Sequence, residues 1–113
     1  MENLICETLD DLRERARLTA KDLADFTDVS EATISWWASG AQATPDHRTQ
    51  LVLYDLRYVV DRMADLHTPD ETRTWLYSKN ALLAGGTAIE LIRAGRTEEV
   101  RSAIEGLLAA TYL

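Results

Sequence analysis

The sequence contains little cysteine, glycine or proline, and it has no long apolar run. Cys6 is the single cysteine of the 113 residues, which excludes an internal disulfide and any zinc site built from several cysteines. The longest apolar stretches, such as residues 51–54 and 81–84, are far shorter than the ~20 residues of a membrane-spanning helix. The first residues lack the basic and apolar regions of a signal peptide, so we expect a cytoplasmic protein.

Positive charge is also scarce. Twelve lysines and arginines stand against nineteen aspartates and glutamates, which gives a net charge of −7. Such a chain repels a polyanion unless its cations cluster, and this argues against a protein that only binds DNA. The hydrophobic content of 46% is sufficient for a core, and the length predicts one domain or two small ones that share a helix.

The sequence shows no catalytic or metal-binding motif. His47 and His67 belong to no HExxH pattern, and the five glycines form neither a dinucleotide-binding motif nor a phosphate-binding loop. We therefore expect no enzymatic activity, no cofactor and no metal site.

Capping residues and apolar periodicity predict helices along the whole chain. Apolar residues at positions 5, 9, 12 and 16 share one stripe of a first helix. Thr19 with Asp22 and Ser30 with Glu31 then open two short helices, the second of which ends at Gly40. No segment longer than a few residues alternates with the period of a strand, so the predicted fold class is all-α.

A long helix is predicted from Thr44 to Leu66, with Thr44 as its cap and Pro45 at its first position. Its main apolar stripe contains positions 52, 56, 59, 63 and 66. Further apolar residues lie outside that stripe, namely Leu51, Leu53, Tyr58 and Val60. A second neighbour in the chain or a second copy of it could cover them, and we expect a homodimer.

Three further helices are expected after the long one. Thr68, Pro69 and Glu71 predict a reciprocal capping box. The helix that it opens is expected to carry Trp75 and residues 82–83 up to the glycines at 85–86. Thr87 with Glu90 repeats the box, and Thr97 opens the last helix.

Residues 19–40 have the pattern of a helix-turn-helix. Ala24 is small where the two short helices cross, Val29 lies in the turn, and Ile34 and Trp37 face inward. This segment resembles the Xre family of helix-turn-helix regulators. The resemblance implies that the second short helix offers four residues to a major groove, namely Glu31, Ala32, Ser35 and Trp36.

The charge of this segment is the opposite of what phosphate binding requires. Residues 19–40 contain one lysine and four acids. A helix-turn-helix retained for packing or dimerisation therefore remains an alternative to one that reads DNA.

The second half carries a different resemblance. Trp75, Asn80, the glycines at 85–86 and the Glu-Glu-Val at 98–100 occur in the order found in the toxin-binding domain of Xre/MbcA/ParS antitoxins. The similarity covers about the last 40 residues, although Ala88 stands where relatives often carry proline. We therefore assign residues 1–67 to a helix-turn-helix and dimerisation module and residues 68–113 to a toxin-binding module.

The resemblance implies the antitoxin of a type II toxin-antitoxin pair. Its partner would be a RES-domain toxin that degrades NAD, neutralised when the antitoxin's C-terminal end enters the NAD cleft. The implied assembly is a homodimer within a larger hetero-oligomer, with operator binding for autoregulation as a second role. The toxin-binding candidates are Lys79, Asn80, Arg101, Thr111, Tyr112 and Leu113.

Three alternatives remain open from the sequence. The apolar C-terminal residues could fold back on the chain's own core instead of entering a partner. The protein could be a stand-alone helix-turn-helix transcription regulator whose C-terminal half only oligomerises. It could also be a helical adaptor without a DNA role, which fits the acidic charge best.

Overall fold

The computed structural model describes residues 4–40 and 44–111, the last without its side chain. Its helices are α1 (Leu4–Ala16), α2 (Ala20–Thr27), α3 (Glu31–Ala38), α4 (His47–Ala64), α5 (Pro69–Tyr77), the 3-10 turn η1 (Ala81–Leu83), α6 (Ala88–Arg93) and α7 (Thr97–Thr111). Within these residues the only β-type pairing is an isolated bridge between Lys79 and Thr87. The predicted all-α class is confirmed. None of the described helices has the length and apolarity needed to cross a bilayer.

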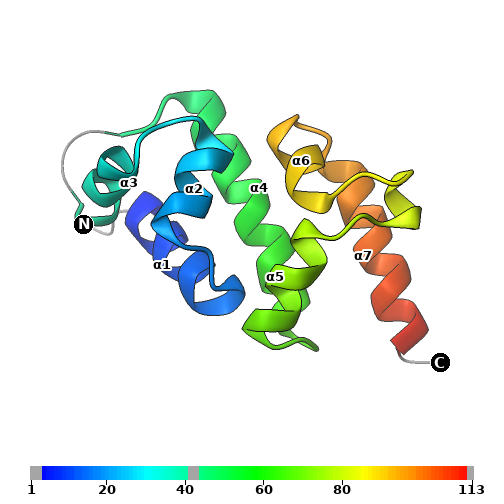
Figure 1. The fold of residues 1–113 in the computed structure, drawn as a ribbon. Helices are drawn as coiled ribbons and strands as arrows, with labels where there is room; N and C mark the ends of the chain where they lie inside the picture. Colours follow the sequence, from blue (N-terminus) through cyan, green and yellow to red (C-terminus); the bar gives the residue numbers. More distant parts are fainter. Residues whose placement is uncertain (1–3, 41–43, 112–113) are drawn as a thin grey trace.

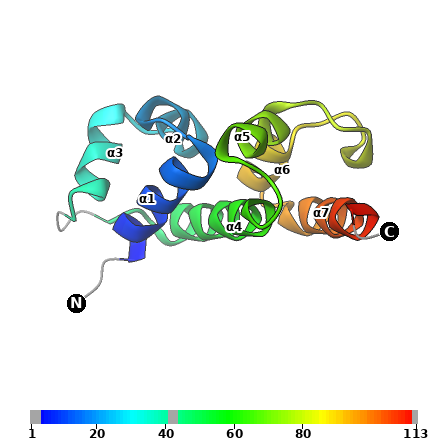
Figure 2. The same cartoon turned by 90° about the horizontal axis from the view of Figure 1, so that it is seen from below.

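Helix α4 is the centre of the molecule and packs against α1, α5, α6 and α7. Figure 1 shows α1, α2 and α3 on one side of it and α6 and α7 on the other. In Figure 2, α4 and α7 lie along one edge, α2, α3, α5 and α6 lie above them, and α1 reaches down to that edge. The molecule measures 46 × 24 × 21 Å, and α3 and η1 lie at opposite ends of its long axis (Figures 1 and 2).

Helices α4 and α7 pack in parallel, and two polar contacts join them. The Thr97 hydroxyl donates to the Asp55 carboxylate at 3.0 Å, and Arg62 donates to Glu105 at 2.9 Å. Both contacts join residues about 43 positions apart, which fixes the register of the two helices. The C-terminal end of α7 is thereby directed away from α3 (Figure 1).

The apolar residues of α4 that lie outside its main apolar stripe are only partly exposed. Leu53 and Val60 have no exposed surface, whereas Leu51 and Tyr58 are 49% and 42% exposed. Neighbours within the same chain therefore cover much of what a second copy was expected to cover. Leu66 was expected in the buried stripe, but α4 ends at Ala64 and Leu66 is 41% exposed.

The predicted caps are mostly confirmed. Thr19 with Asp22 and Thr68 with Glu71 form reciprocal capping boxes, and the Ser30 hydroxyl accepts the Thr33 N–H. At α6 only one half of the expected box is described, in which Thr87 accepts the Glu90 N–H at 3.2 Å.

The start of the long helix differs from the prediction. Its cap is Asp46, whose carboxylate accepts the Thr49 N–H at 2.8 Å. Pro45 therefore lies before the cap rather than at the first helical position. An aspartate carboxylate is a better acceptor for the free N–H groups at a helix start than the threonine hydroxyl of Thr44, which was the predicted cap.

The helix that begins at Pro69 is shorter than the sequence indicated. It ends at Tyr77, and residues 78–87 form a closed loop around η1. The Asn80 N–H donates to the Gly86 carbonyl at 3.0 Å, and the Gly85 N–H donates to the Asn80 carbonyl at 2.9 Å. Ala84 and Gly85 have left-handed backbones, with φ of 55° and 82°. These closing bonds compete with continuation of the helix, and the loop leaves Leu82 67% exposed.

Candidate functional site

The four DNA candidates share one outward surface of α3. Glu31, Ala32, Ser35 and Trp36 are all exposed, and Trp36 is 63% exposed. Ile34 and Trp37 are buried on the opposite side, as the spacing predicted. The helix-turn-helix therefore presents a contact surface that contains one large aromatic ring and no cation.

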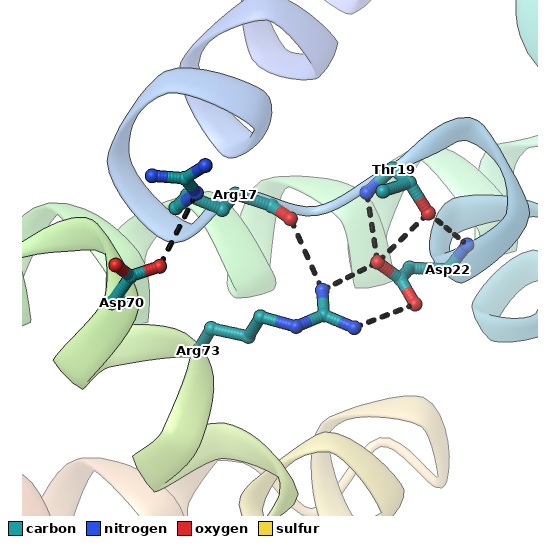
Figure 3. Close-up of polar contacts among 5 residues, drawn as sticks. All are labelled: Arg17, Thr19, Asp22, Asp70 and Arg73. Carbon is teal, nitrogen blue, oxygen red and sulfur yellow. Dashed lines mark hydrogen bonds and ion pairs between the residues drawn. The ribbon is translucent and has the colours of Figure 1, made fainter.

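The structure changes the charge balance near this surface, because Asp22 is paired with a distant arginine. Figure 3 shows the Asp22 carboxylate bound by Thr19 and by the Arg73 guanidinium of α5. Arg73 also donates to the Arg17 carbonyl at 3.1 Å. The Arg73 hydrogen bonds are the main cause that holds the pKa of Asp22 below its ordinary value. One of the four acids is thus neutralised by the second half of the chain.

A second ion pair lies beside the first with the charges exchanged, so that here the acid belongs to α5. The Arg17 side chain lies 3.2 Å from the Asp70 carboxylate of α5 (Figure 3). We call these five residues the interhelical clamp: Arg17, Thr19, Asp22, Asp70 and Arg73. The clamp joins the start of α2 to α5 across 51 positions of sequence. Only the Thr19 capping box could be read from the sequence, since no local pattern identifies the other partners.

In the second half of the chain, α5 and the following loop border an open groove with a volume of about 530 Å³ and mainly apolar walls. It is lined by His67, Asp70, Glu71, Thr74, Trp75, Ser78, Lys79, Asn80 and Ala81. We call it the Trp75 groove. Trp75 packs partly against the core, and the exposed Leu82 lies on the adjacent loop.

Two of the toxin-binding candidates lie together at this groove. Lys79 is exposed and has no acidic partner among the residues the structure describes. Asn80 is half-buried, and its side-chain oxygen accepts the Leu82 N–H at 2.9 Å. Asn80 therefore shapes the loop that carries Leu82.

The remaining candidates lie elsewhere. Arg101 does not line the Trp75 groove. Its guanidinium lies 4.6 Å from the centre of the Tyr58 ring and 3.0 Å from Glu98, and these groups, Glu98 first, raise its pKa. Thr111 is the last residue of α7, while Tyr112 and Leu113 lie outside the described residues.

Two residues at this groove and its loop were not among the sequence candidates, namely Trp75 and Leu82. The sequence placed both within the helix that begins at Pro69, and only Trp75 lies there. Asn80 before an apolar turn, followed by the paired glycines at 85–86, is the pattern that could have indicated an exposed loop.

A titratable cluster lies between α1 and α4, away from both surfaces. Burial, followed by the nearby Asp11 carboxyl, raises the pKa of Asp61 to about 6. Arg15 and Arg57 flank the two acids, at 3.4 Å and 3.8 Å from Asp61. Because all four groups hold the two helices together, this is a structural ion-pair network. The described residues contain no group of histidines, cysteines or acids arranged to hold a metal ion.

The comparisons with known proteins agree with this arrangement. A family model described as a helix-turn-helix domain matches residues 6–75, which contain both short helices and the exposed α3 surface. The chain is thus a member of the helix-turn-helix domain family.

The matches to individual proteins extend beyond that domain. Mycobacterial cidal antitoxin MbcA of Mycobacterium tuberculosis is 27% identical over 98% of this chain and 97% of its own length. The probable mycobacterial cidal antitoxin Rv3188 of the same organism is 32% identical over 85% of this chain and 81% of its own. The chain therefore belongs to the family of mycobacterial cidal antitoxins, in agreement with the resemblance to Xre/MbcA/ParS antitoxins.

One solved structure is similar over the whole chain. It is the crystal structure of the M. tuberculosis MbcT-MbcA toxin-antitoxin complex, with a TM-score of 0.83 and 26% identity over 99% of this chain and 100% of that one. At this identity most side chains differ, so the roles of individual residues must be argued from this chain's own geometry.

Proposed function

We propose that this protein is the antitoxin of a type II pair and that it neutralises its toxin by direct binding. The observation that carries the proposal is the full-length similarity to a protein crystallised in a toxin-antitoxin complex. The similarity includes the residues beyond the helix-turn-helix match, where the loop around η1, part of the Trp75 groove and α7 lie. The protein then acts by binding rather than by catalysis.

The partner in this proposal is a RES-domain toxin that degrades NAD, and the C-terminal end of the antitoxin blocks the NAD cleft. Several features support this assignment. Helix α7 leads away from the core toward the end of the molecule opposite to α3 (Figures 1 and 2). After Glu105 the sequence has no charged side chain, and it ends in a tyrosine and a leucine. A tyrosine ring supplies a large contact area at small entropic cost.

The body of the toxin docks, in this proposal, on the Trp75 groove and on Leu82. An exposed leucine beside an apolar groove is an anchor whose burial is favourable by about 1.5–3 kcal/mol. Lys79 at the rim has no acidic partner among the described residues and is available to an acidic group of the toxin. Arg101 would contact the toxin from the α7 side, while remaining stacked on Tyr58.

Deletion of residues 111–113 tests the blocking mechanism. The measurements are NAD consumption by the toxin encoded beside this chain and binding of the two proteins by calorimetry. We expect the deletion to abolish inhibition while complex formation is largely retained, because the groove and loop remain. A truncated chain that still inhibits fully would contradict blocking by the tail. Trp36→Ala is the matched control, since it removes an aromatic ring at the opposite end and should leave inhibition unchanged.

Operator binding is the second proposed role, and the exposed α3 surface within the helix-turn-helix match supports it. Salt-dependent binding of the full chain to the DNA upstream of its gene tests it. If no such binding occurs at low ionic strength, the regulatory role fails while toxin neutralisation stands. A stand-alone regulator would show the reverse, with DNA binding and no effect on the toxin.

We also propose a homodimer within a larger hetero-oligomer. Leu51 and Tyr58 lie one heptad apart on α4 and remain exposed, which supports a self-contact along that helix. Light scattering of the free chain and of the complex measures both assembly states. Leu51→Asp should convert the dimer to monomer, and a wild-type chain that is monomeric at high concentration would contradict this proposal.

A further inference from the structure

The cations of this protein divide into two groups. Most arginines are held by acids in ion pairs, namely Arg15, Arg17, Arg57, Arg62, Arg73, Arg96 and Arg101. The other cations have no acidic partner among the described residues, namely Arg13, Lys21, Arg48, Lys79 and Arg93. Since acids outnumber cations in this chain, an unpaired cation is a notable feature. Its position indicates where an anion can bind.

Arg13 lies beside the outward surface of α3. It lines a groove of about 300 Å³ between α1, α2 and α3, which it shares with Ser35 of α3 and Ala20 of α2. Among the described residues that line this groove, Arg13 carries the only charge. Its guanidinium and the neighbouring Ser35 hydroxyl are the types of donor that bind phosphate oxygens.

Lys21 lies on α2, which packs against α3. It is exposed and directly follows Ala20 in the first turn of α2. Its neighbour Asp22 does not offset this charge, because the interhelical clamp already pairs that carboxylate with Arg73. Arg13 and Lys21 are therefore exposed cations on α1 and α2, the two helices that pack against α3, and neither has an ion-pair partner among the described residues.

The other unpaired cations have different surroundings. Arg48 and Arg93 line a depression together with Asp28 and Asp46, whose carboxylates offset the positive charge there. Lys79 lies at the far end of the molecule, beside the Trp75 groove. Of the unpaired cations described, Arg13 lines a groove together with an exposed residue of α3, and Lys21 lies on the adjoining helix α2.

We propose that Arg13 and Lys21 bind backbone phosphates of duplex DNA along one edge of the major groove that receives α3. This inference rests on the proposed operator binding and names the residues that supply its electrostatic part. Neither residue belongs to α3, so their contacts position the helix without reading the sequence. The exposed Ser35 and Trp36 are left to contact the base edges.

The test measures how DNA affinity depends on salt. The full chain is titrated onto a fluorescently labelled DNA duplex of mixed sequence over a range of potassium chloride concentrations. Arg13→Ala and Lys21→Ala should each reduce the slope of log K against log salt by about 1, and the double variant by about 2. The reduction should be the same on a second duplex of unrelated sequence, because phosphate contacts carry no sequence information.

Two controls separate a phosphate contact from a general effect. Arg93→Ala removes one unpaired cation at another position and should leave the slope unchanged, although it changes the net charge equally. Arg13→Lys keeps the charge and should keep the slope. Thermal unfolding of all variants should match that of the wild type, since neither residue has an ion pair to lose among the described residues.

The outcomes distinguish this inference from the role on which it rests. A wild-type chain without salt-dependent DNA binding would overturn operator binding itself. A wild type that binds, while both alanine variants keep its full slope, would overturn the assignment of these two residues and leave operator binding intact. A slope reduced as much by Arg93→Ala as by Arg13→Ala would also overturn the assignment, because net charge alone would then explain the effect.

Discussion

The two ends of the molecule present different chemistry to a partner. At the α3 end the exposed surface belongs to a regular helix and carries small polar residues and Trp36, with the exposed cations Arg13 and Lys21 on the adjoining helices α1 and α2. At the η1 end it is formed by a non-helical loop and the Trp75 groove, with Leu82 exposed. The first surface suits a polyanion and the second suits another protein. The difference indicates that one small chain can serve two kinds of partner because the surfaces lie at opposite ends of its long axis.

The two surfaces are separate in space but depend on one core. Helix α4 contacts helices of both halves, and the interhelical clamp ties α2 to α5. The proposed module boundary between residues 67 and 68 falls in the turn between α4 and α5, while packing continues across it. The ends therefore differ in surface chemistry and share their stability.

The largest effect is expected when the shared core is damaged. Leu56 has no exposed surface in the middle of α4, and Leu56→Ala should cost about 3 kcal/mol of unfolding free energy through lost burial and a cavity. Urea unfolding followed by tryptophan fluorescence and by circular dichroism should give one coincident transition at a lower midpoint. Two separate transitions would show that the halves fold independently. Leu82→Ala, at an exposed leucine, is the control and should change the midpoint little.

The next largest effect is on partner binding, and it should distinguish the η1 end of the molecule from the α3 end. Leu82→Asp places a charge where the toxin is proposed to bury an apolar side chain, and it should weaken toxin binding by about 30-fold, or about 2 kcal/mol. Trp36→Ala at the other end should leave toxin binding unchanged and weaken DNA binding. Calorimetry with the toxin and anisotropy with DNA measure the two affinities. The comparison fails if either variant weakens both affinities equally.

Local sequence patterns predicted most of the helices. The caps at Thr19, Ser30 and Thr68 and the inward pair Ile34 and Trp37 are all determined within three or four residues of the chain. A capping hydroxyl or a helical spacing carries the same meaning in any context, which is why such features can be read from a single sequence.

The features that define the candidate surfaces are not local. The loop around η1 is closed by bonds between residues 80 and 85–86 that compete with a continuing helix, and helical propensity gives no account of that competition. The pairing of Asp22 with Arg73 depends on the docking of α5 against the start of α2. Counting charges along residues 19–40 therefore overstated the negative field around α3, whereas helical spacing correctly predicted the buried pair Ile34 and Trp37.

The interhelical clamp should have an intermediate effect on stability. Arg73→Ala leaves the partly buried Asp22 carboxylate without its guanidinium partner and should cost about 1–2 kcal/mol of unfolding free energy at pH 7. Arg96→Ala is the matched control, because exposed Glu99 near the start of α7 is the one acid that Arg96 pairs with among the described residues, and it should cost less than about 0.5 kcal/mol. Thermal unfolding of both variants against the wild type gives the comparison, and equal losses would contradict a special role for the clamp.

The clamp also predicts a pH dependence of this loss. The pKa of Asp22 is lowered in the folded protein from an ordinary value of 3.8. The stabilisation is therefore complete above that value and is lost as the pH falls through the lower, folded pKa. The difference in stability between the wild type and Arg73→Ala should shrink in strongly acidic solution. A difference that stays constant with pH would show that Arg73 stabilises by packing rather than by its charge.

The smallest effect concerns Asp61, whose pKa changes in the opposite direction. Its folded pKa of about 6 lies above the ordinary 3.8, so the folded state holds this proton more tightly than the unfolded state. The resulting stabilisation is complete below pH 3.8 and is lost as the pH rises through about 6. Asp61→Asn cannot ionise, so it should match or exceed the wild type at pH 7 by less than about 1 kcal/mol. The gap should narrow as the pH falls below about 6 and close only below pH 3.8.

The neighbouring acid provides a way to contradict that prediction. Because Asp11 contributes to the raised pKa of Asp61, the substitution should have a smaller pH-dependent effect in an Asp11→Asn background. Urea unfolding at a series of pH values, with the four proteins of this double-mutant cycle, measures the coupling. If Asp61→Asn destabilises equally at every pH, then its ion pairs with Arg15 and Arg57 outweigh burial and repulsion, and the acids stabilise the contact between α1 and α4 at neutral pH. If the difference in stability between Asp61→Asn and the wild type closes on acidification only while Asp11 is present, the two carboxyls titrate as one unit. Because this unit is remote from both partner surfaces, mild acid should then stabilise the shared core without changing the binding of either partner.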